Sequence, residues 1–590
     1  MLYFSSHDPA CRIPLGPAAA GSTVQFRFYA DNVTHVVFRG WMGNDLHIPM
    51  VRSGADSFTV DLPVPKETGL LWYDFLLVRA DGSRSRYVAP PDGLGGIGHE
   101  DFHPENTDSS YQLTVYQPSF KTPSFLHSAT IYQIFPDRFF RSASASIDSR
   151  TDRQMHAKWN EDLYTGEQPR AKNNNVLEFY GGNLNGIREK LPYLASLGVD
   201  VLYLNPIFEA SSNHRYDTAD YTRIDPLLGT EEEFTALCTQ AENMGIHILL
   251  DGVFSHTGED SRYFNRFGHY DTVGAYQSKE SPFFDWYTFE TWPMKYRSWW
   301  GIHTLPEVRK NNPVYQEFMF RRPDGILPRW INAGASGWRL DVADELPMDF
   351  LRRLRKTVKA TRRDAVVLGE VWEDASNKIA YGEMRCYCTG DTLDSVMNYP
   401  LRTAILDFLL RKTNADALVR LVRHQEEVYP AQFRYALMNL LGSHDRARVL
   451  NALVGIEGQQ LSKHAQRALR LTPQEYDLAV RRYKTGLSIL CALPGCPTIY
   501  YGDEAGMTGG PDPFCRRPYP WGEEDTELRQ FVMNKLQQRK HSYVLRFGFC
   551  DISAPDADSI RIRRYLDGTT DALGHKHPQV MEEIITIRRP

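Results

Sequence analysis

The stretch Thr230–Phe254 decides the fold, and its sequence is TEEEFTALCTQAENMGIHILLDGVF. Thr230 followed three residues later by Glu233 is typical of a capping box at a helix N-terminus. The apolar side chains that follow are spaced as on one face of a helix: Phe234, Leu237, Cys238, Ala241 and Met244. Gly245 is typical of a helix end, and the apolar run over 246–254 predicts a buried strand. The stretch therefore predicts one helix followed directly by one strand.

The same unit recurs elsewhere in the chain. One copy has a helical stripe over 187–197 and an apolar strand over 199–204, although Pro192 conflicts with an unbroken helix. Another has a stripe over 350–358 before a strand over 365–368. Helix, stop and buried strand, repeated over about 400 residues, predict an α/β fold with a parallel sheet and helices outside it. At this length a closed (β/α)8 TIM barrel is favoured over an open doubly wound sheet.

The N-terminal part of the chain has a different periodicity. Apolar residues alternate with polar ones over 24–28 and again over 58–62, which is typical of half-buried strands. We therefore expect an N-terminal β-sandwich over 1–122, resembling a carbohydrate-binding module, and a barrel over 126–548.

A run of aromatic residues interrupts the barrel after the strand that ends at Asp251. Fourteen of the 38 positions from 263 to 300 are aromatic, against 12% in the whole chain. This segment is too long for an ordinary strand-to-helix connection, so we expect an inserted subdomain over 256–311 that leans over the barrel mouth. Most of its rings should form its own core, and the rest would offer flat apolar surfaces that suit sugar rings.

Composition excludes several classes of function. The chain of 590 residues has 67 basic and 73 acidic side chains, so it lacks the basic footprint of a nucleic-acid-binding protein. No apolar run reaches the roughly 18 residues needed to span a membrane, and the N-terminus shows no secretory signal. The 8 cysteines are sparse and form no CxxC pair, which fits a reducing compartment. We expect a cytoplasmic protein that binds neither nucleic acid nor membrane.

Acidic side chains end four of the predicted strands. They are Asp251, Asp341, Glu370 and the aspartate of the pair His444-Asp445. The carboxyl edge of a barrel is where catalytic groups collect. A single carboxylate there is equally well explained as a helix cap. Four that converge need a substrate, a proton or a cation to offset their repulsion.

Four segments around these residues carry a resemblance. They are Asp251-Gly-Val-Phe-Ser-His256, Gly337-Trp-Arg-Leu-Asp341, Gly369-Glu-Val-Trp372 and Ser443-His-Asp445. In order and spacing they resemble the signature segments of the α-amylase superfamily, glycoside hydrolase family 13. The β-rich N-terminus resembles the extra domain of the cyclomaltodextrinase, neopullulanase and maltogenic amylase branch. The resemblance implies a retaining α-glucan hydrolase built on a TIM barrel.

The resemblance also implies catalytic roles. Asp341 would be the nucleophile, Glu370 the general acid/base, and Asp445 the third acid, which grips sugar hydroxyls as the oxocarbenium-like state forms. A retaining enzyme needs the first two carboxyls about 5 Å apart. Arg339 precedes Asp341 by two residues, so both side chains face one side of the strand and the guanidinium can hold the carboxylate ionised.

Further residues match the family's substrate-binding positions. His256 and His444 would hydrogen-bond the sugar; a lone histidine is more often structural, but both lie inside matching segments. Tyr216 would stack under the cleaved glucose, and Asp512 with Arg516 would close the non-reducing end of the cleft.

Trp372 follows Glu370 by two residues, so strand alternation aims it at the leaving-group side of the cleft. We expect its ring to stack on the departing sugar, with a loss of activity in Trp372→Ala that is larger for oligosaccharides than for an activated aryl glucoside.

No cofactor or metal is expected. Gly93–Gly98 fits the GxGxxG pattern, but Pro90-Pro91 precedes it and no helical stripe follows, so a loop is the better account. Cys386 and Cys388 have no second pair that would complete a metal site. Several relatives bind calcium after the equivalent of Asp137-Arg138-Phe139, but the segment over 140–146 is poor in the oxygen ligands that calcium prefers.

Departures from the family pattern leave the substrate open. This chain has Val342-Ala-Asp-Glu345 where the branch usually has Val-Ala-Asn-Glu, and Leu305-Pro-Glu-Val-Arg309 where it usually has Met-Pro-Lys-Leu-Asn. The expected C-terminal β-domain, 549–590, is shorter than usual. We expect cleavage of α-1,4 bonds in maltooligosaccharides or cyclodextrins. The alternatives are an amylopullulanase-like enzyme, an α-glucosidase, or a non-catalytic carbohydrate-binding or transporter-associated barrel.

The resemblance finally implies a homodimer. In that branch the N-terminal domain of one subunit often leans on the active-site mouth of its neighbour, which narrows the cleft and favours small substrates.

Overall fold

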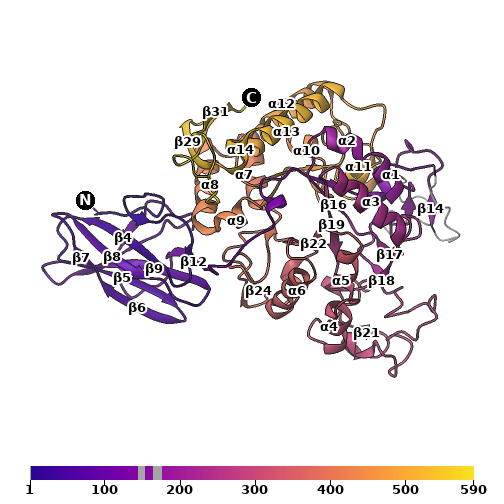
Figure 1. Ribbon diagram of the computed structural model, residues 1–590, viewed down its shortest axis with the longest axis horizontal. Helices are drawn as coiled ribbons and strands as arrows, with labels where there is room; N and C mark the ends of the chain where they lie inside the picture. The colour runs from indigo at the N-terminus through magenta and orange to yellow at the C-terminus, as the bar shows by residue number, and fades with distance from the viewer. Residues whose placement is uncertain (1, 144–152, 164–175) are drawn as a thin grey trace.

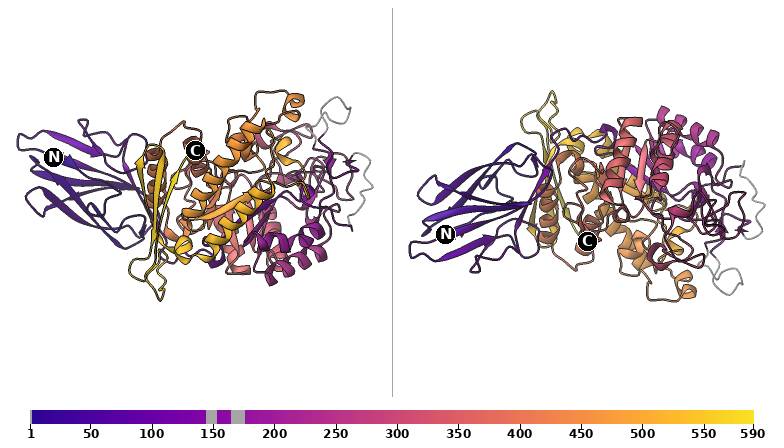
Figure 2. Two further views of the ribbon diagram at one scale, coloured as in Figure 1. Left: turned by 90° about the horizontal axis from the view of Figure 1, so that it is seen from above. Right: turned by 90° about the horizontal axis from the view of Figure 1, so that it is seen from below.

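The computed structural model describes residues 2–143, 153–163 and 176–590. The N-terminal strands form one end of an elongated molecule, and the helices of the barrel form the other (Figure 1). Two further views place the C-terminal strands between these parts (Figure 2). Within the described ranges, no helix has both the length and the apolar character needed to cross a membrane.

The N-terminal part is a sandwich of two sheets. One sheet contains β1 (Leu2–Tyr3), β2 (Arg12–Ile13), β4 (Thr23–Ala30), β7 (Val51–Arg52) and β8 (Ser57–Pro63). The other contains β3 (Ala18–Ala19), β5 (His35–Met42), β6 (Asn44–Pro49), β9 (Gly69–Val78), β10 (Arg84–Val88), β11 (His99–Asp101) and β12 (Tyr111–Tyr116). The two alternating stretches predicted as strands pair with each other, so that Phe26 lies opposite Val60 and Phe28 opposite Phe58. Their side chains join a buried aromatic core between the sheets.

Eight parallel strands form the barrel. In chain order they are β13 (Ile131–Ile134), β16 (Val201–Leu204), β19 (His247–Gly252), β22 (Gly337–Leu340), β23 (Val366–Gly369), β26 (Ser395–Val396), β27 (Met438–Leu440) and β28 (Cys496–Tyr500). Each pairs with its neighbours in sequence, and β28 pairs with β13. A parallel bridge between Met397 and Met438 joins β26 to β27 and completes the ring. The predicted closed barrel is confirmed.

The helices are α1 (Leu184–Glu189), α2 (Leu191–Ser196), α3 (Glu231–Asn243), α4 (Pro313–Phe320), α5 (Ile326–Asn332), α6 (Met348–Thr361), α7 (Tyr399–Leu409), α8 (Ala415–Val428), α9 (Ala431–Arg434), α10 (Val449–Ala452), α11 (Lys463–Arg467), α12 (Pro473–Ala492), α13 (Thr526–His541) and α14 (Tyr543–Phe547). The capping box of Thr230 and Glu233 is present at α3. The conflict at Pro192 is resolved because the expected single helix is two helices that meet at Lys190. Pro192 lies in the first turn of α2, where its missing N–H breaks no helical hydrogen bond.

One barrel strand is followed by no helix, contrary to the expected repeat. Between β23 and β26 the chain forms only the small hairpin of β24 (Ile379–Ala380) and β25 (Glu383–Met384). This segment begins at Glu370, so the hairpin lies on the connection that leaves the predicted acid/base.

The aromatic insertion follows β19. It holds the short hairpin of β20 (Phe289–Thr291) and β21 (Lys295–Tyr296), and its buried rings include Tyr263, Phe264, Trp286 and Tyr287. Phe267 and Trp300 are exposed, at 53% and 77% respectively. Smaller pairs are β14 (Gln154–Met155) with β15 (Glu178–Phe179), and β17 (Phe208–Ala210) with β18 (Thr218–Ile224). The chain ends in an antiparallel sheet of β29 (Phe549–Asp556), β30 (Ser559–Tyr565) and β31 (Glu582–Arg588).

The sandwich contacts the barrel of its own chain at two places. Glu427 on α8 is buried and lies 2.8 Å from Nε2 of His7 in the sandwich. The side-chain amide of Gln112 on β12 donates to Oγ of Ser376 at 3.0 Å and accepts from Nδ2 of Asn377 at 2.9 Å. Ser376 and Asn377 belong to the segment that follows Glu370, so the sandwich is hydrogen-bonded to the connection that bears the predicted acid/base.

Candidate active site

A cavity of about 1470 Å³ opens where the barrel strands end. It is lined by nine of the ten residues predicted to form the site: Tyr216, His256, Asp341, Glu370, Trp372, His444, Asp445, Asp512 and Arg516. The tenth, Arg339, is buried beneath this surface and is 1% exposed. The structure therefore brings the whole predicted set together.

Arg339 joins three of the carboxylates. Its Nη1 donates to Oδ1 of Asp251 at 2.7 Å and to Oδ1 of Asp341 at 3.1 Å. Its Nη2 lies 2.9 Å from Oε2 of Glu370. One guanidinium thus holds both predicted catalytic carboxylates, one at each of its two terminal nitrogens. The planar guanidinium of arginine is well suited to binding carboxylates in this way.

Glu370 is fixed at both of its oxygens. Besides Arg339, its Oε2 accepts a hydrogen bond of 2.8 Å from the backbone N–H of Val342, and its Oε1 accepts one of 3.1 Å from Nε1 of Trp372. Val342 has a φ of 36°, in the left-handed region that β-branched residues avoid. Backbone strain of this kind clusters at functional sites, and here the strained residue directs its N–H to the carboxylate.

Burial and mutual repulsion shift the acids of the cluster. Burial raises the pKa of Asp341 well above its ordinary value, with Glu370 adding to the shift and Arg339 opposing it. Burial raises the pKa of Asp251 as well. For Asp445, burial and then the charge of Glu370 raise the pKa to about 7. Asp445 therefore keeps its proton up to near-neutral pH, whereas Arg339 offsets part of the effect of burial at Asp341, whose carboxylate must be ionised to act as a nucleophile.

Removing the charge of Asp445 should stabilise the protein only at high pH. Its native pKa of about 7 lies above its ordinary value of 3.8, so the folded state binds the proton more tightly than the unfolded chain. The free energy of unfolding therefore falls as the pH rises from the lower value through the higher one. Asparagine does not ionise, so Asp445→Asn does not show this fall in the free energy of unfolding. Its Tm should exceed that of the wild type by a few degrees at pH 8 and match it at pH 4. The exposed Asp271→Asn is the control, with no difference at either pH; a gain confined to pH 4 would contradict the prediction.

A hydrogen-bonded chain crosses the floor of the cavity. The hydroxyl of Tyr216 donates to Oδ2 of Asp251 at 2.7 Å and lies 2.7 Å from Nε2 of His444. Gln133 donates to Nδ1 of His444 at 2.8 Å, which leaves the proton on Nε2, facing Tyr216 and Asp445. Tyr216 and His444 are each held by hydrogen bonds, so their ring orientations are set before a ligand binds.

Both histidines are neutral. Burial lowers the pKa of His256 to about 3. Burial, together with Arg516 and Arg339, lowers the pKa of His444 well below its ordinary value. Nε2 of His256 is held 3.1 Å from the carbonyl oxygen of Tyr216. Neutral rings can hydrogen-bond a sugar without repelling positive charge that develops beside them.

The last two predicted residues form an ion pair at the cavity wall. Nη1 of Arg516 lies 3.0 Å from Oδ1 of Asp512, whose side chain is half exposed. The same guanidinium lies 3.5 Å from Oδ1 of Asp445 and donates to the carbonyl oxygen of His444 at 3.0 Å. Arg516 thus links the cavity wall to the third acid.

Trp372 lies at the site, but not as expected. Tyr399 stacks on its ring at 4.0 Å between centroids and 5° between planes. The guanidinium of Arg446 lies 4.4 Å from the same ring centroid. The parallel ring and the guanidinium occupy ring surface that a departing sugar would need, so these contacts speak against the expected stacking. The contact of Trp372 with the chemistry is the hydrogen bond to Glu370.

Several residues of the site were missed from the sequence. The hydroxyl of Tyr203 donates to Oδ2 of Asp251 at 2.6 Å, and Nδ2 of Asn205 donates to the hydroxyl of Tyr216 at 2.9 Å. Gln133 carries one signal, because it is a polar residue inside the apolar strand β13, and Asn205 carries another, because it directly follows the apolar strand β16.

Residues 144–146 of the segment considered for calcium lie outside the described residues. Among the residues that are described, no group of three or more histidine, cysteine, aspartate or glutamate side chains could hold a metal ion.

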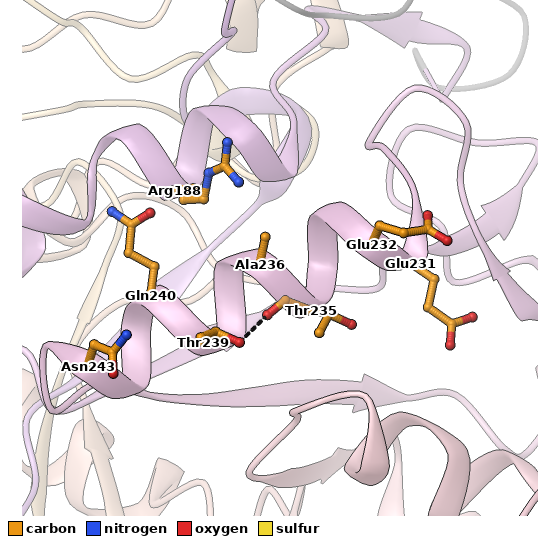
Figure 3. Close-up of a pocket in the computed structure, with 8 residues that line it drawn as sticks. All are labelled: Arg188, Glu231, Glu232, Thr235, Ala236, Thr239, Gln240 and Asn243. Carbon is orange, nitrogen blue, oxygen red and sulfur yellow. Dashed lines mark hydrogen bonds between the residues drawn. The ribbon is translucent and has the colours of Figure 1, made fainter.

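A second hollow lies on the outer surface of the barrel, over α3 (Figure 3). It is lined by Arg188, Glu231, Glu232, Thr235, Ala236, Thr239, Gln240 and Asn243. Thr239 donates there to the backbone carbonyl of Thr235 within the same helix, at 2.9 Å. None of the predicted site residues lines this hollow, and it carries no chemistry of its own.

Known proteins resemble this chain over most of its length. The family model "Alpha amylase, catalytic domain" matches residues 133–542. An amylopullulanase of Thermoanaerobacter thermohydrosulfuricus is 35% identical over 99% of this chain and 42% of its own length. Neopullulanase 2 of Thermoactinomyces vulgaris is 36% identical over 78% of this chain and 71% of its own. A solved cyclomaltodextrinase structure is 25% identical with a TM-score of 0.65, covering 99% of this chain and 90% of that one.

The matches agree with the geometry. This chain spans less than half the length of the amylopullulanases that it matches. The matched range 133–542 contains seven of the eight barrel strands, the second half of β13 and every predicted site residue. The relatives include the neopullulanase and cyclomaltodextrinase branch predicted from the sequence. The chain belongs to the α-amylase family, glycoside hydrolase family 13.

Proposed function

We propose that this chain is a retaining α-glucan hydrolase that cleaves α-1,4-glucosidic bonds in maltooligosaccharides and cyclodextrins. The observation that carries the proposal is the binding of Asp341 and Glu370 to the single guanidinium of Arg339, at one edge of a cavity large enough for several sugar rings. A guanidinium that binds both carboxyls keeps them on one side of the cavity, and double displacement would require them to lie about 5 Å apart.

The reaction would run in two steps. Asp341 attacks the anomeric carbon and forms a glycosyl ester, while Glu370 protonates the departing glycosidic oxygen. Glu370 then takes a proton from water, whose oxygen attacks the same carbon and releases Asp341. Asp445 would hold the sugar hydroxyls through both steps. The neutral histidines would add hydrogen bonds without opposing the positive charge on the ring.

Retention of configuration tests the proposed chemistry. Hydrolysis of maltotriose should release the α anomer first, with the β anomer appearing only at the rate of mutarotation, because two inversions restore the starting configuration. Proton NMR of the anomeric signals during the first minutes measures this. Early accumulation of the β anomer would exclude Asp341 as a nucleophile.

Trp372→Phe should lower kcat about tenfold, by the same factor for maltotriose and for an aryl maltoside. Phenylalanine keeps a ring in contact with Tyr399 and Arg446 but removes the N–H that holds Glu370. Parallel kinetics on the two substrates provide the measurement. A loss confined to maltotriose would instead support stacking on the departing sugar.

A second candidate is an amylopullulanase-like activity. It is favoured by the amylopullulanase that aligns with 99% of this chain. Chromatography of products from pullulan separates the two, because cleavage of α-1,6 bonds releases maltotriose whereas cleavage of α-1,4 bonds releases trisaccharides that still contain one α-1,6 bond. The same experiment with cyclodextrin and starch ranks the α-1,4 substrates and covers the α-glucosidase alternative.

The homodimer and the cytoplasmic location also remain proposals. The sandwich already contacts α8 and the segment after Glu370 within its own chain, so a partner would have to use its other faces, where Val51 and Phe102 are each 70% exposed. Light scattering at micromolar concentration should give twice the mass of one chain. All 8 cysteines are unpaired, which fits a reducing compartment.

A further inference from the structure

Three exposed aromatic side chains line the same cavity, namely Phe267, Trp300 and Tyr381. Two of them come from different parts of the chain and share one hydrogen-bond partner. Trp300, from the aromatic insertion, is 77% exposed, and Tyr381, from the hairpin after β23, is 72% exposed. Both line the cavity that contains Asp341 and Glu370. Large apolar side chains exposed beside a cavity are typical of binding surfaces.

One carboxylate holds both rings. Oε1 of Glu345 accepts a hydrogen bond from Nε1 of Trp300 at 3.1 Å and another from the hydroxyl of Tyr381. Glu345 follows Asp341 by four residues, so it is anchored to the catalytic strand. The polar edges of both rings are thereby satisfied, and their apolar surfaces stay open to solvent.

A row of rings connects this rim to the interior of the site. His256 lies 5.4 Å from Trp299 between ring centroids, and Trp299 stacks on Trp300 at 5.3 Å and 21°. Trp300 itself has a φ of 50°, a conformation that non-glycine residues seldom adopt. Backbone strain of this kind clusters at functional sites, and here it falls on the residue that bears the outer ring of the row.

We propose that Trp300 and Tyr381, tethered by Glu345, form a platform that binds the distal glucose units of a long α-glucan chain. The inference rests on the proposed function and extends it to substrate length. Tyr381 lies on the segment that leaves Glu370, the proton donor to the leaving group, so the platform serves the leaving-group side. Asp344, Lys378 and Glu373 line the cavity beside it and offer partners for sugar hydroxyls.

Binding to an inactivated chain tests the platform without requiring hydrolysis. In an Asp341→Asn background, Trp300→Ala should weaken the binding of maltohexaose about tenfold and leave the binding of maltose unchanged, because only the longer chain reaches the rim. Tyr381→Ala should act in the same direction, and Tyr381→Phe, which keeps the ring and loses the tether, should lose less. Titration calorimetry measures all four chains. Phe102→Ala, an exposed aromatic of the sandwich outside the cavity, is the matched control and should change neither affinity.

The outcomes separate the platform from the proposed function. Equal weakening for maltose and maltohexaose, or no weakening for either, overturns the platform and leaves the hydrolase intact. If the Asp341→Asn chain binds neither sugar, the proposed function and the platform both fail. Thermal unfolding that is unchanged in Trp300→Ala, as expected for a side chain exposed to this extent, shows that a loss of affinity does not come from misfolding.

Discussion

Replacing Asp341 with asparagine lowers kcat on maltotriose by about 10⁴-fold or more, the range found when a catalytic nucleophile is lost. The amide cannot form the glycosyl ester, yet it has nearly the shape of the carboxylate and can still accept the hydrogen bond from Arg339. The fold should therefore survive the change. Steady-state kinetics on maltotriose and on a chromogenic maltoside measure the loss.

Two controls sharpen this prediction. Asp344→Asn removes a carboxylate three residues further on, whose Oδ1 accepts from Tyr387 at 2.5 Å, and it should cost less than tenfold. Asp341→Ala given azide and an activated aryl maltoside should yield the β-glycosyl azide, because the external anion attacks from the side that Asp341 has left. Equal inertness of the wild type and the asparagine variant would instead favour a non-catalytic carbohydrate-binding barrel.

Glu370→Gln should lower kcat on maltotriose by about 10³-fold, within the range expected for loss of a general acid. Glutamine keeps an oxygen for the N–H of Val342 but has no proton to give to the departing oxygen. An aryl maltoside with a strongly acidic phenol needs no such proton, so formation of the glycosyl ester should be little affected. Burst kinetics with the aryl substrate measure that step directly.

Hydrolysis of the glycosyl ester, which should be the slow step in Glu370→Gln, provides a control for this prediction. The ester should accumulate, because water then lacks a general base, and added azide should speed turnover of the variant while leaving the wild type unchanged. Losses of the same size on maltotriose and on the aryl substrate would assign Glu370 to binding rather than to proton transfer.

The sequence was sufficient to predict the barrel and its acidic edge for a local reason. Asp251, Asp341 and Glu370 each end or follow a short apolar strand, and parallel strands bring such ends to one edge. The approach of Arg339 to Asp341 follows from the period of two along one strand.

Long-range packing explains what could not be predicted. Alternation along the strand places Trp372 at the site, but the contacts on its ring are made by Tyr399 and Arg446, which come from other segments of the barrel. No local pattern distinguishes Tyr381 from an ordinary loop tyrosine, and its pairing with Glu345 depends on how a helix-free connection folds across the cavity. The site was therefore predictable where one strand decides it, and not where several segments meet.

The amide of Gln112, which exchanges hydrogen bonds with Ser376 and Asn377, bears on how such a chain can be recombined. A chimera could join another relative's sandwich to this barrel between the end of β12 at Tyr116 and the start of β13 at Ile131. It would separate partners that lie more than 250 positions apart in the sequence. The donor sandwich would have to bring an amide at the same place, or the recipient would have to exchange the segment after Glu370 as well. The sandwich and the segment after Glu370 must therefore be exchanged together. In a library of exchanged domains, activity should be retained most often when both come from the same parent.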